Sequence, residues 1–186
     1  MIYLARHGET DDNARRVVQG WIDTPLNDRG REQARELAAR VADLGIVSLW
    51  TSQLARAAET ARIVGDALGL EPRADDRLAE SRRGSWEGRS LDEIERTEPE
   101  AWAAWKRGGP TFRFPGGGES LTEHQDRVLA ALEAVRAGDQ PALVVAHGGT
   151  IRCAVCANHP DGLRAFWSIP VPNAEIVPLG RVATRT

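Results

Sequence analysis

The sequence predicts an α/β layer fold built on a largely parallel sheet. Short apolar segments rich in β-branched residues alternate with longer segments of helical periodicity along the 186 residues. The helical segments begin at cap residues and close at glycines, whereas the short segments run into turns that carry histidine or serine. Because strands that alternate with helices pair in parallel, the carboxyl ends of these strands should gather at one edge of the sheet.

The first strand is expected at residues 2–6, a β-branched and aromatic run that ends in Arg-His-Gly. A helix is expected over about 28–43, with Asn27 as its N-cap and Gly45 just past its end. The elements expected next are a strand at 47–51, a helix at 54–68 closed by Gly69, and a short strand near 71–74.

The segment 76–118 is less regular, because glycines interrupt it around one or two helical pieces at about 90–106. Ser120-Leu-Thr-Glu123 is a capping box that opens a helix ending near Gly138. The remaining expected elements are a strand at 142–146, a helix directly after His147, a last strand at 174–179 and a short tail from Gly180.

Length and charge favour one globular domain over 1–186, in which 76–118 forms a substrate-side subregion. A net charge of -3 with no basic run argues against nucleic acid as a partner. The chain has no signal peptide pattern and no apolar window long enough to span a membrane. With two cysteines, Cys153 and Cys156, in an apolar stretch, the cytoplasm is the expected compartment. The sequence does not indicate an oligomeric state.

Two histidines follow predicted strands and are each followed by glycine. His7 lies in Arg6-His7-Gly8 after the first strand, and His147 follows the strand at 142–146. Arg6 offers donors suited to phosphate oxygens, and Gly8 permits close approach of the backbone to a ligand. Because the chain has only four histidines, two at the same edge of one sheet predict a shared site.

Arg56 lies at the start of the helix after the second strand, where free backbone amides favour anions. Glu80 and Glu87 are two candidate functional carboxylates, and spacing alone does not choose between them. Two arginines and two imidazoles can neutralise a phosphate dianion without a metal, while an acid protonates the leaving group. These residue types therefore predict phosphoryl transfer through a covalent phosphohistidine.

A set of ordered motifs resembles the histidine phosphatase superfamily, and more closely its small phosphoglycerate-mutase-like phosphatases. The motifs are Arg6-His7-Gly8-Glu9-Thr10, Asn13, Gly20…Pro25-Leu26…Gly30, Thr51-Ser52-Gln53-Leu54-Ala55-Arg56, Glu80…Gly84-Ser85-Trp86-Glu87-Gly88, Gly117-Gly118-Glu119-Ser120 and His147-Gly148-Gly149-Thr150-Ile151-Arg152. The match runs in order from residue 2 to about 177. It implies a three-layer α/β/α sandwich around a mostly parallel sheet with one antiparallel strand.

The resemblance also implies roles for individual residues. His7 is expected to be the nucleophile, and Arg6, Arg56 and His147 the phosphate clamp. The proton donor is expected to be Glu80 and not Glu87. The other residues expected on the substrate side are Asn13, Gly20 and Gly148.

Relatives that act as mutases are generally longer, with an insertion after the acidic residue and an extended tail. The short segment after Glu80 and the few residues after Leu179 therefore favour hydrolysis over retransfer. The expected function is a phosphomonoesterase for small phosphate esters, with no cofactor and no metal. Mutase-type transfer and a phosphate-binding module without turnover remain as alternatives, and the sequence does not identify the substrate.

Other polar and aromatic residues receive structural interpretations. Cys153 and Cys156 are expected in the core, because no second ligand pair accompanies them, and His124 and His159 at the surface. The tryptophans expected to serve packing are Trp50, Trp102, Trp105 and Trp167. The basic residues expected over the pocket, where they would meet an anionic or polyhydroxylated leaving group, are Arg82, Arg83, Lys106 and Arg113.

Overall fold

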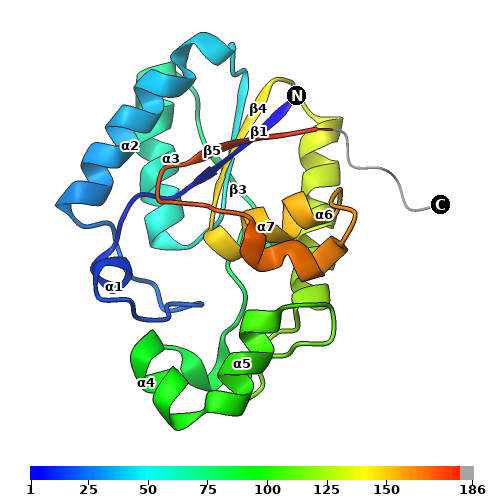
Figure 1. Cartoon of the computed structure of the whole chain (residues 1–186). Helices are drawn as coiled ribbons and strands as arrows, with labels where there is room; N and C mark the ends of the chain where they lie inside the picture. The colour runs from blue at the N-terminus through cyan, green and yellow to red at the C-terminus, as the bar shows by residue number, and fades with distance from the viewer. Residues whose placement is uncertain (181–186) are drawn as a thin grey trace.

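The computed structural model describes residues 1–180, and in it helices cover both faces of a central sheet (Figure 1). The sheet has the strand order β3-β2-β4-β1-β5. Its strands are β1 (Ile2–Arg6), β2 (Ser48–Thr51), β3 (Arg73–Ala74), β4 (Ala142–Ala146) and β5 (Ile176–Leu179). All neighbours pair in parallel except β1 with β5, which is antiparallel. The predicted α/β/α sandwich with one reversed strand is confirmed.

The helices begin and end close to the expected positions. They are α1 (Asp11–Ala14), α2 (Asp28–Val41), α3 (Ala55–Leu68), α4 (Leu91–Thr97), α5 (Pro99–Arg107), α6 (Leu121–Ala137) and α7 (Gly148–Cys156). Asn27 caps α2 by accepting from the Gly30 amide, and Ser120 and Glu123 form the expected capping box of α6. The short α1 and a run of 3-10 helix at Gly162–Ser168 were not expected. The expected tail after Gly180 lies outside the described residues.

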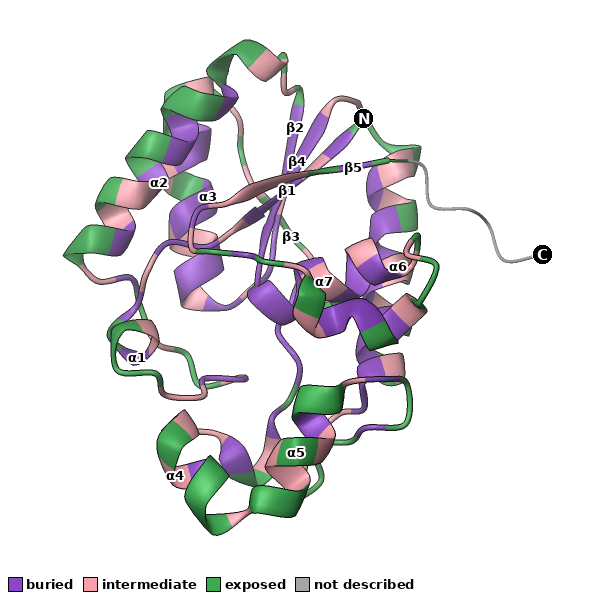
Figure 2. Cartoon of the chain, viewed as in Figure 1, coloured by how far each residue is buried: buried purple, intermediate pink, exposed green. Residues whose placement is uncertain are grey.

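Two apolar cores lie on opposite faces of the sheet. Helices α2 and α3 pack on one face, where Leu37 and Val64 meet the β4 residues Leu143 and Val145. Helices α6 and α7 pack on the other face through residues such as Leu132 and Ile151. All residues of β4 are buried (Figure 2), as expected for a central parallel strand covered on both faces.

A third cluster, rich in aromatic residues, forms from the irregular segment 76–118 and the chain after α7. Trp86 lies at its centre and is fully buried, with the ring of Trp105 at 5.5 Å and that of Phe114 at 5.6 Å. Cys153 and Cys156 pack into this cluster as free thiols, which confirms the expectation that they belong to the core. Within residues 1–180 no helix is both long and apolar enough to cross a membrane.

Candidate active site

Parallel pairing brings the two predicted histidines together at the carboxyl edge of the sheet. Arg6 is paired with Ala146 at the ends of β1 and β4, so the next residue of each strand, His7 and His147, leaves the sheet at the same level. The His7 amide still donates to the Ala146 carbonyl at 3.0 Å. The two imidazole centroids lie 5.2 Å apart and both rings are buried.

A cavity of about 180 Å³ opens at this edge. It is lined by Arg6, His7, Asn13, Val17, Val18, Gln19, Gly20, Arg56, Glu80, Arg83, Leu91, Trp105, Gly148, Gly149, Arg152 and Trp167. All the predicted site residues are among these except His147, which lies beside His7 and behind the cavity wall. The segment 76–118 contributes to the wall through Glu80, Arg83, Leu91 and Trp105. Stretches of the chain from Arg6 to Trp167 thus meet at one small site.

Backbone carbonyls, not carboxylates, fix the two predicted phosphate-binding arginines. Arg6 Nη1 donates to the Val171 carbonyl at 2.7 Å. Arg56 donates from Nη1 to the Ile22 carbonyl at 2.9 Å and from Nη2 to the Gly20 carbonyl at 2.8 Å. Because carbonyls orient a guanidinium without neutralising it, both groups keep a full positive charge beside the cavity.

Three buried nitrogens of the predicted clamp have no hydrogen-bond partner among the residues the structure describes. They are Nε of Arg6, Nε of Arg56 and Nδ1 of His147. A buried polar atom without a partner is rare, because its desolvation is not offset by a hydrogen bond. Arg6 and Arg56 line the cavity and the His147 ring lies beside that of His7, so these three unpartnered nitrogens are suited to an oxygen-rich anion.

The backbone sets the tautomer of His7. Its Nδ1 lies 2.6 Å from the carbonyl oxygen of Gly8, which can only accept, so Nδ1 carries the proton. The lone pair therefore resides on Nε2. Burial, together with the charges of Arg56 and Arg6, holds the pKa of His7 well below its usual value. The ring is thus neutral at pH 7, with Nε2 free to act as a nucleophile.

Gly8 is needed for chain packing, a constraint that the sequence did not indicate. A Cβ at this position would lie 2.3 Å from the carbonyl oxygen of Gly30 at the start of α2. The Gly8 amide donates to Thr60 Oγ1 on α3. Gly8 therefore ties the loop after β1 to both helices on that face, which fixes the position of the His7 ring.

Ser52, which directly follows β2, holds His147 in position. His147 Nε2 lies 2.9 Å from Ser52 Oγ, which also accepts from the Leu54 amide. Burial and the neighbouring charge of Arg56 lower the pKa of His147 well below its usual value. His147 is therefore a neutral ring that Ser52 orients against His7.

The structure separates the two candidate carboxylates. Glu80 lines the cavity and accepts from the amides of Ser81 at 2.8 Å and Gly149 at 3.1 Å. Glu87 lies outside the cavity and accepts from the amides of Arg83 at 2.8 Å and Trp21 at 3.3 Å. Glu87 thus joins two loops, and Glu80 is the carboxylate placed to meet a ligand.

Burial alone would keep Glu80 neutral, but its neighbours act in the opposite direction. The Arg83 guanidinium lies 3.2 Å from Oε1, and with the hydrogen bond from the Ser81 amide it holds the pKa of Glu80 well below its usual value. Glu80 is therefore a carboxylate paired with Arg83.

Comparison with known proteins agrees with this geometry. Residues 2–184 match the family described as "Histidine phosphatase superfamily (branch 1)". The chain belongs to the histidine phosphatase superfamily. An Escherichia coli protein named "Probable phosphoglycerate mutase GpmB" is 40% identical over 161 residues, which cover 83% of this chain and 72% of that protein.

Solved structures of other histidine phosphatases superpose closely. Bacillus stearothermophilus YhfR gives a TM-score of 0.86 at 32% identity, covering 97% of this chain and 92% of that one. A mycobacterial glucosyl-3-phosphoglycerate phosphatase, solved with VO3, gives a TM-score of 0.82 at 30% identity, covering 94% and 88% of the two chains. This histidine phosphatase therefore shares its fold with these proteins.

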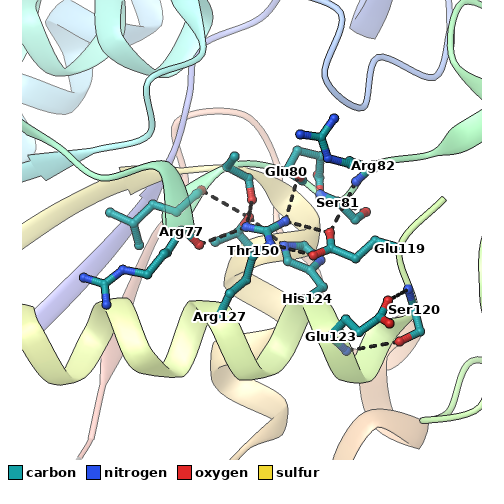
Figure 3. Close-up of polar contacts among 12 residues, drawn as sticks. Arg77, Glu80, Ser81, Arg82, Glu119, Ser120, Glu123, His124, Arg127 and Thr150 are labelled. Carbon is teal, nitrogen blue, oxygen red and sulfur yellow. Dashed lines mark hydrogen bonds and ion pairs between the residues drawn. The ribbon is translucent and has the colours of Figure 1, made fainter. Parts of the chain in front are cut away.

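Helix α6 holds the Glu80 segment of this histidine phosphatase in place (Figure 3). Arg127 donates to the carbonyls of Arg77 at 2.9 Å, Ala79 at 2.8 Å and Glu80 at 2.9 Å. The same guanidinium pairs with both oxygens of Glu119, at 2.6 and 2.8 Å. A single arginine thus fixes three backbone carbonyls within residues 77–80, the segment that carries the carboxylate.

The expectation that His124 lies at the surface is wrong. It is fully buried on α6, and its Nε2 lies 3.1 Å from Thr150 Oγ1, which also lies 3.0 Å from the Ala79 carbonyl (Figure 3). Burial lowers the pKa of His124 to about 4, so the ring is neutral at pH 7. The polar sequence around it gave no sign that this face of α6 packs against the Glu80 segment.

Several cavity residues of this histidine phosphatase were not assigned to the site from sequence. Arg152 belongs to the motif that begins at His147, but no role was predicted for it. Trp167, which was expected in the core, is partly buried and lines the cavity. Trp105 both packs in the aromatic cluster and lines the cavity. Of the four basic residues expected over the pocket, only Arg83 lines it. Within the described residues, no group of three or more His, Cys, Asp or Glu is arranged to hold a metal ion.

Proposed function

We propose that this chain is a phosphomonoesterase that hydrolyses small phosphate esters through a phosphohistidine on His7, without a metal. The observation that supports it most strongly is the set of buried, unpartnered nitrogens of Arg6, Arg56 and His147 around the reactive Nε2 of His7. The mycobacterial relative, a phosphatase by name, was solved both with VO3 and with inorganic phosphate. A cavity of about 180 Å³ suits a small ester.

In the first step, the phosphoryl oxygens bind to the guanidiniums of Arg6 and Arg56 and to the imidazole of His147. Nε2 of His7 attacks phosphorus in line with the leaving oxygen, so an N–P bond forms as the ester P–O bond breaks. Glu80, as the acid, gives its proton to the departing alkoxide. The arginines stabilise the charge that spreads over the phosphoryl oxygens.

Glu80 must gain a proton before it can act as this acid. A bound phosphate dianion brings negative charge beside the carboxylate, which raises the carboxyl pKa by like-charge repulsion. The dianion also competes for the arginines that keep Glu80 ionised in the empty cavity. Substrate binding and protonation of Glu80 are therefore coupled.

In the second step, water attacks phosphorus on the phosphohistidine. The Glu80 carboxylate, which lost its proton in the first step, takes one from this water. The N–P bond breaks, inorganic phosphate leaves and His7 returns to its neutral form. Over both steps one ester and one water give one alcohol and one phosphate.

The simplest test is hydrolysis of p-nitrophenyl phosphate in the presence of a chelator. Phosphate release that is unchanged by the chelator supports the proposal. Loss of activity on chelation contradicts the metal-free mechanism. Phosphate binding without release of nitrophenol identifies a binding module instead.

Mutase-type transfer is a second candidate, because the E. coli relative carries a phosphoglycerate mutase name. The two activities differ in the fate of the phosphoryl group. A hydrolase releases one inorganic phosphate per ester consumed, whereas a mutase returns the group to a hydroxyl of the product. Incubation with 3-phosphoglycerate and quantification of free phosphate against the 2-phospho isomer distinguishes them.

We also propose the cytoplasm as the compartment. Two buried free thiols, Cys153 and Cys156, support a reducing setting. Fractionation of producing cells tests this, and recovery of the protein outside the cytoplasmic fraction contradicts it.

A further inference from the structure

The cavity carries more positive charge than one phosphate requires. Four guanidinium groups line it, those of Arg6, Arg56, Arg83 and Arg152. The only carboxylate among the lining residues is that of Glu80, and His7 and His147 are neutral because their pKa values are lowered. A phosphate dianion and an ionised Glu80 together offset three of the four charges. One positive charge remains, and two remain when Glu80 is protonated to act as an acid.

Arg83 is the first of the two guanidiniums outside the predicted clamp. Its Nη2 lies 3.2 Å from Glu80 Oε1, and its side chain is 11% exposed. The guanidinium lies over the ring of Phe114, 4.4 Å from the centroid, and 6.0 Å from the centroid of Trp105. Aromatic faces hold a guanidinium in place while leaving its edge free to donate hydrogen bonds.

Arg152 is the second guanidinium outside the predicted clamp. Its Nε donates to the Ile169 carbonyl at 2.9 Å, and its guanidinium lies 5.1 Å from the centroid of Trp167 and 5.6 Å from that of Phe166. Within residues 1–180 no carboxylate oxygen lies within 4.0 Å of it. Its charge is therefore fixed in the cavity wall without an ion-pair partner.

Arg83 and Arg152 are parts of one surface. The rings of Trp105 and Trp167 beneath them contact edge to face, with their centroids 4.5 Å apart, and Trp167 Nε1 donates to the Trp105 carbonyl at 2.7 Å. Both guanidiniums also face the start of α7. A Cβ on Gly149 would lie 3.0 Å from Arg83 Nη2, and one on Gly148 would lie 3.5 Å from Arg152 Nη1.

The same glycines connect this surface to the phosphoryl site. A Cβ on Gly148 would lie 3.6 Å from Nε of Arg6, one of the unpartnered nitrogens of the clamp. Arg6 and Arg152 therefore approach the same point at the start of α7, and Arg83 lines the same cavity beside Trp105.

We propose that Arg83 and Arg152 form a second anion subsite, so that the preferred substrates carry a carboxylate or a second phosphate on a short leaving group. This proposal rests on the phosphatase function proposed above and specifies its substrate class. The aromatic wall packs against the carbon skeleton, and the two guanidiniums receive the second anion. The cavity volume of about 180 Å³ matches a skeleton of a few carbon atoms.

The subsite also links substrate choice to the acid. In the empty cavity Arg83 is paired with Glu80. An anion on the leaving group competes for the same guanidinium, which weakens the pairing that keeps Glu80 ionised. A substrate with a second anion therefore favours the protonated form of Glu80 at the moment when the leaving oxygen needs a proton.

Two matched pairs of esters test this subsite. Phosphoglycolate and 2-hydroxyethyl phosphate differ by a carboxylate in place of a hydroxymethyl group, and glycerol 1,3-bisphosphate and glycerol 3-phosphate differ by a second phosphate. The wild-type chain should favour the anionic member of at least one pair by about tenfold or more in kcat/KM, the scale of a hydrogen bond between charged groups. The favoured pair identifies the anion. Equal rates or a preference for the neutral member in both pairs overturns the subsite, while the phosphatase function stands.

Substitutions assign the preference to the two arginines. Arg83→Met and Arg152→Met should each reduce the ratio of kcat/KM between the anionic and the neutral ester toward one. Arg83→Lys should retain part of this ratio. Arg82→Met is the matched control, because exposed Arg82 lies over Trp21, 3.6 Å from the ring centroid, and does not line the cavity. Equal losses on both members of a pair in Arg83→Met and Arg152→Met, with the ratio kept, overturn the assignment.

Calorimetric binding of the same esters to the His7→Ala chain gives the preference without turnover. A tenfold affinity ratio there supports the subsite even if the wild-type chain releases no phosphate, an outcome that removes only the proposed function. Equal affinities overturn the subsite independently of activity.

Discussion

At the residue scale, the chemistry depends on small groups held by the backbone. The Gly8 carbonyl fixes the proton of His7 on Nδ1, and carbonyls orient the guanidiniums of Arg6 and Arg56 without neutralising them. Ser52 orients His147. Because backbone groups carry no net charge, they position these side chains while preserving the positive field of the cavity. In the proposed mechanism, a phosphate dianion enters a site whose guanidiniums are already oriented.

Replacing Glu80 by Gln tests the acid. The change preserves most of the shape of the side chain but removes the proton that a poor leaving group needs. Hydrolysis of an alkyl phosphate should fall by about 10² to 10⁴ in kcat, whereas hydrolysis of p-nitrophenyl phosphate should fall far less, since its leaving group is stable as an anion.

Steady-state rates on the two esters make this comparison. Glu87→Gln is the matched control, because Glu87 lies outside the cavity and joins two loops. Equal losses on both esters in Glu80→Gln would place the acid elsewhere.

At the element scale, the sheet edge and the start of α7 could be predicted, whereas the wall above them could not. Periodicity and caps place the strand ends that carry His7 and His147, since local sequence dictates strands and helix starts. Arg152 on α7 and Trp167 in the 3-10 helix after it line the cavity, and that 3-10 helix packs into the aromatic cluster. Long-range packing of this kind leaves no local pattern, and the same is true of buried His124.

Helix α6 positions the Glu80 segment through Arg127. Replacing Arg127 by Met removes donors to three carbonyls, so the carboxylate loses its fixed position. We expect kcat on an alkyl phosphate to fall by about tenfold or more with little change in KM, because small displacements of a reacting group are costly.

Two further variants separate positioning from stability. The double variant Arg127→Met with Glu119→Gln removes the carboxylate that would otherwise stay unpaired. Arg113→Met is a control, because Arg113 is exposed and pairs with Glu123 of α6 without touching the Glu80 segment. An unchanged kcat in Arg127→Met, or an equal fall in Arg113→Met, would contradict the positioning role.

At the scale of the whole molecule, the predicted sandwich is correct because strand and helix alternation is a property of the entire chain. The ordering of motifs likewise pointed to one edge of one sheet. Substrate choice is a different matter, since the cavity wall combines residues from β1, α3, the segment around Glu80, α5 and the chain after α7. No single stretch of sequence contains that surface.

Three buried neutral imidazoles make global stability depend on pH. The pKa values of His7 and His147 are lowered well below 6.5 and that of His124 to about 4, so below pH 6.5 the unfolded chain binds protons that the folded chain does not. Each ring therefore costs about 1.4 kcal/mol of unfolding free energy per pH unit as the pH falls from 6.5 toward its folded-state pKa.

Urea unfolding at pH 7.0, 6.0 and 5.0 measures this slope. His124→Gln should reduce it by about 1.4 kcal/mol per pH unit, since Gln does not titrate. A stability that stays constant between pH 6.5 and 5.0 would show that these rings are not neutral and buried.

The covalent intermediate is the claim on which the account depends most directly. The wild-type chain is mixed with a ³²P-labelled ester, quenched within milliseconds in alkaline denaturant, and digested for peptide mapping. The account predicts label on the peptide that contains His7, lost in the His7→Ala chain, which stays folded but does not turn over. Label on another residue, or phosphate release by the His7→Ala chain, would contradict it.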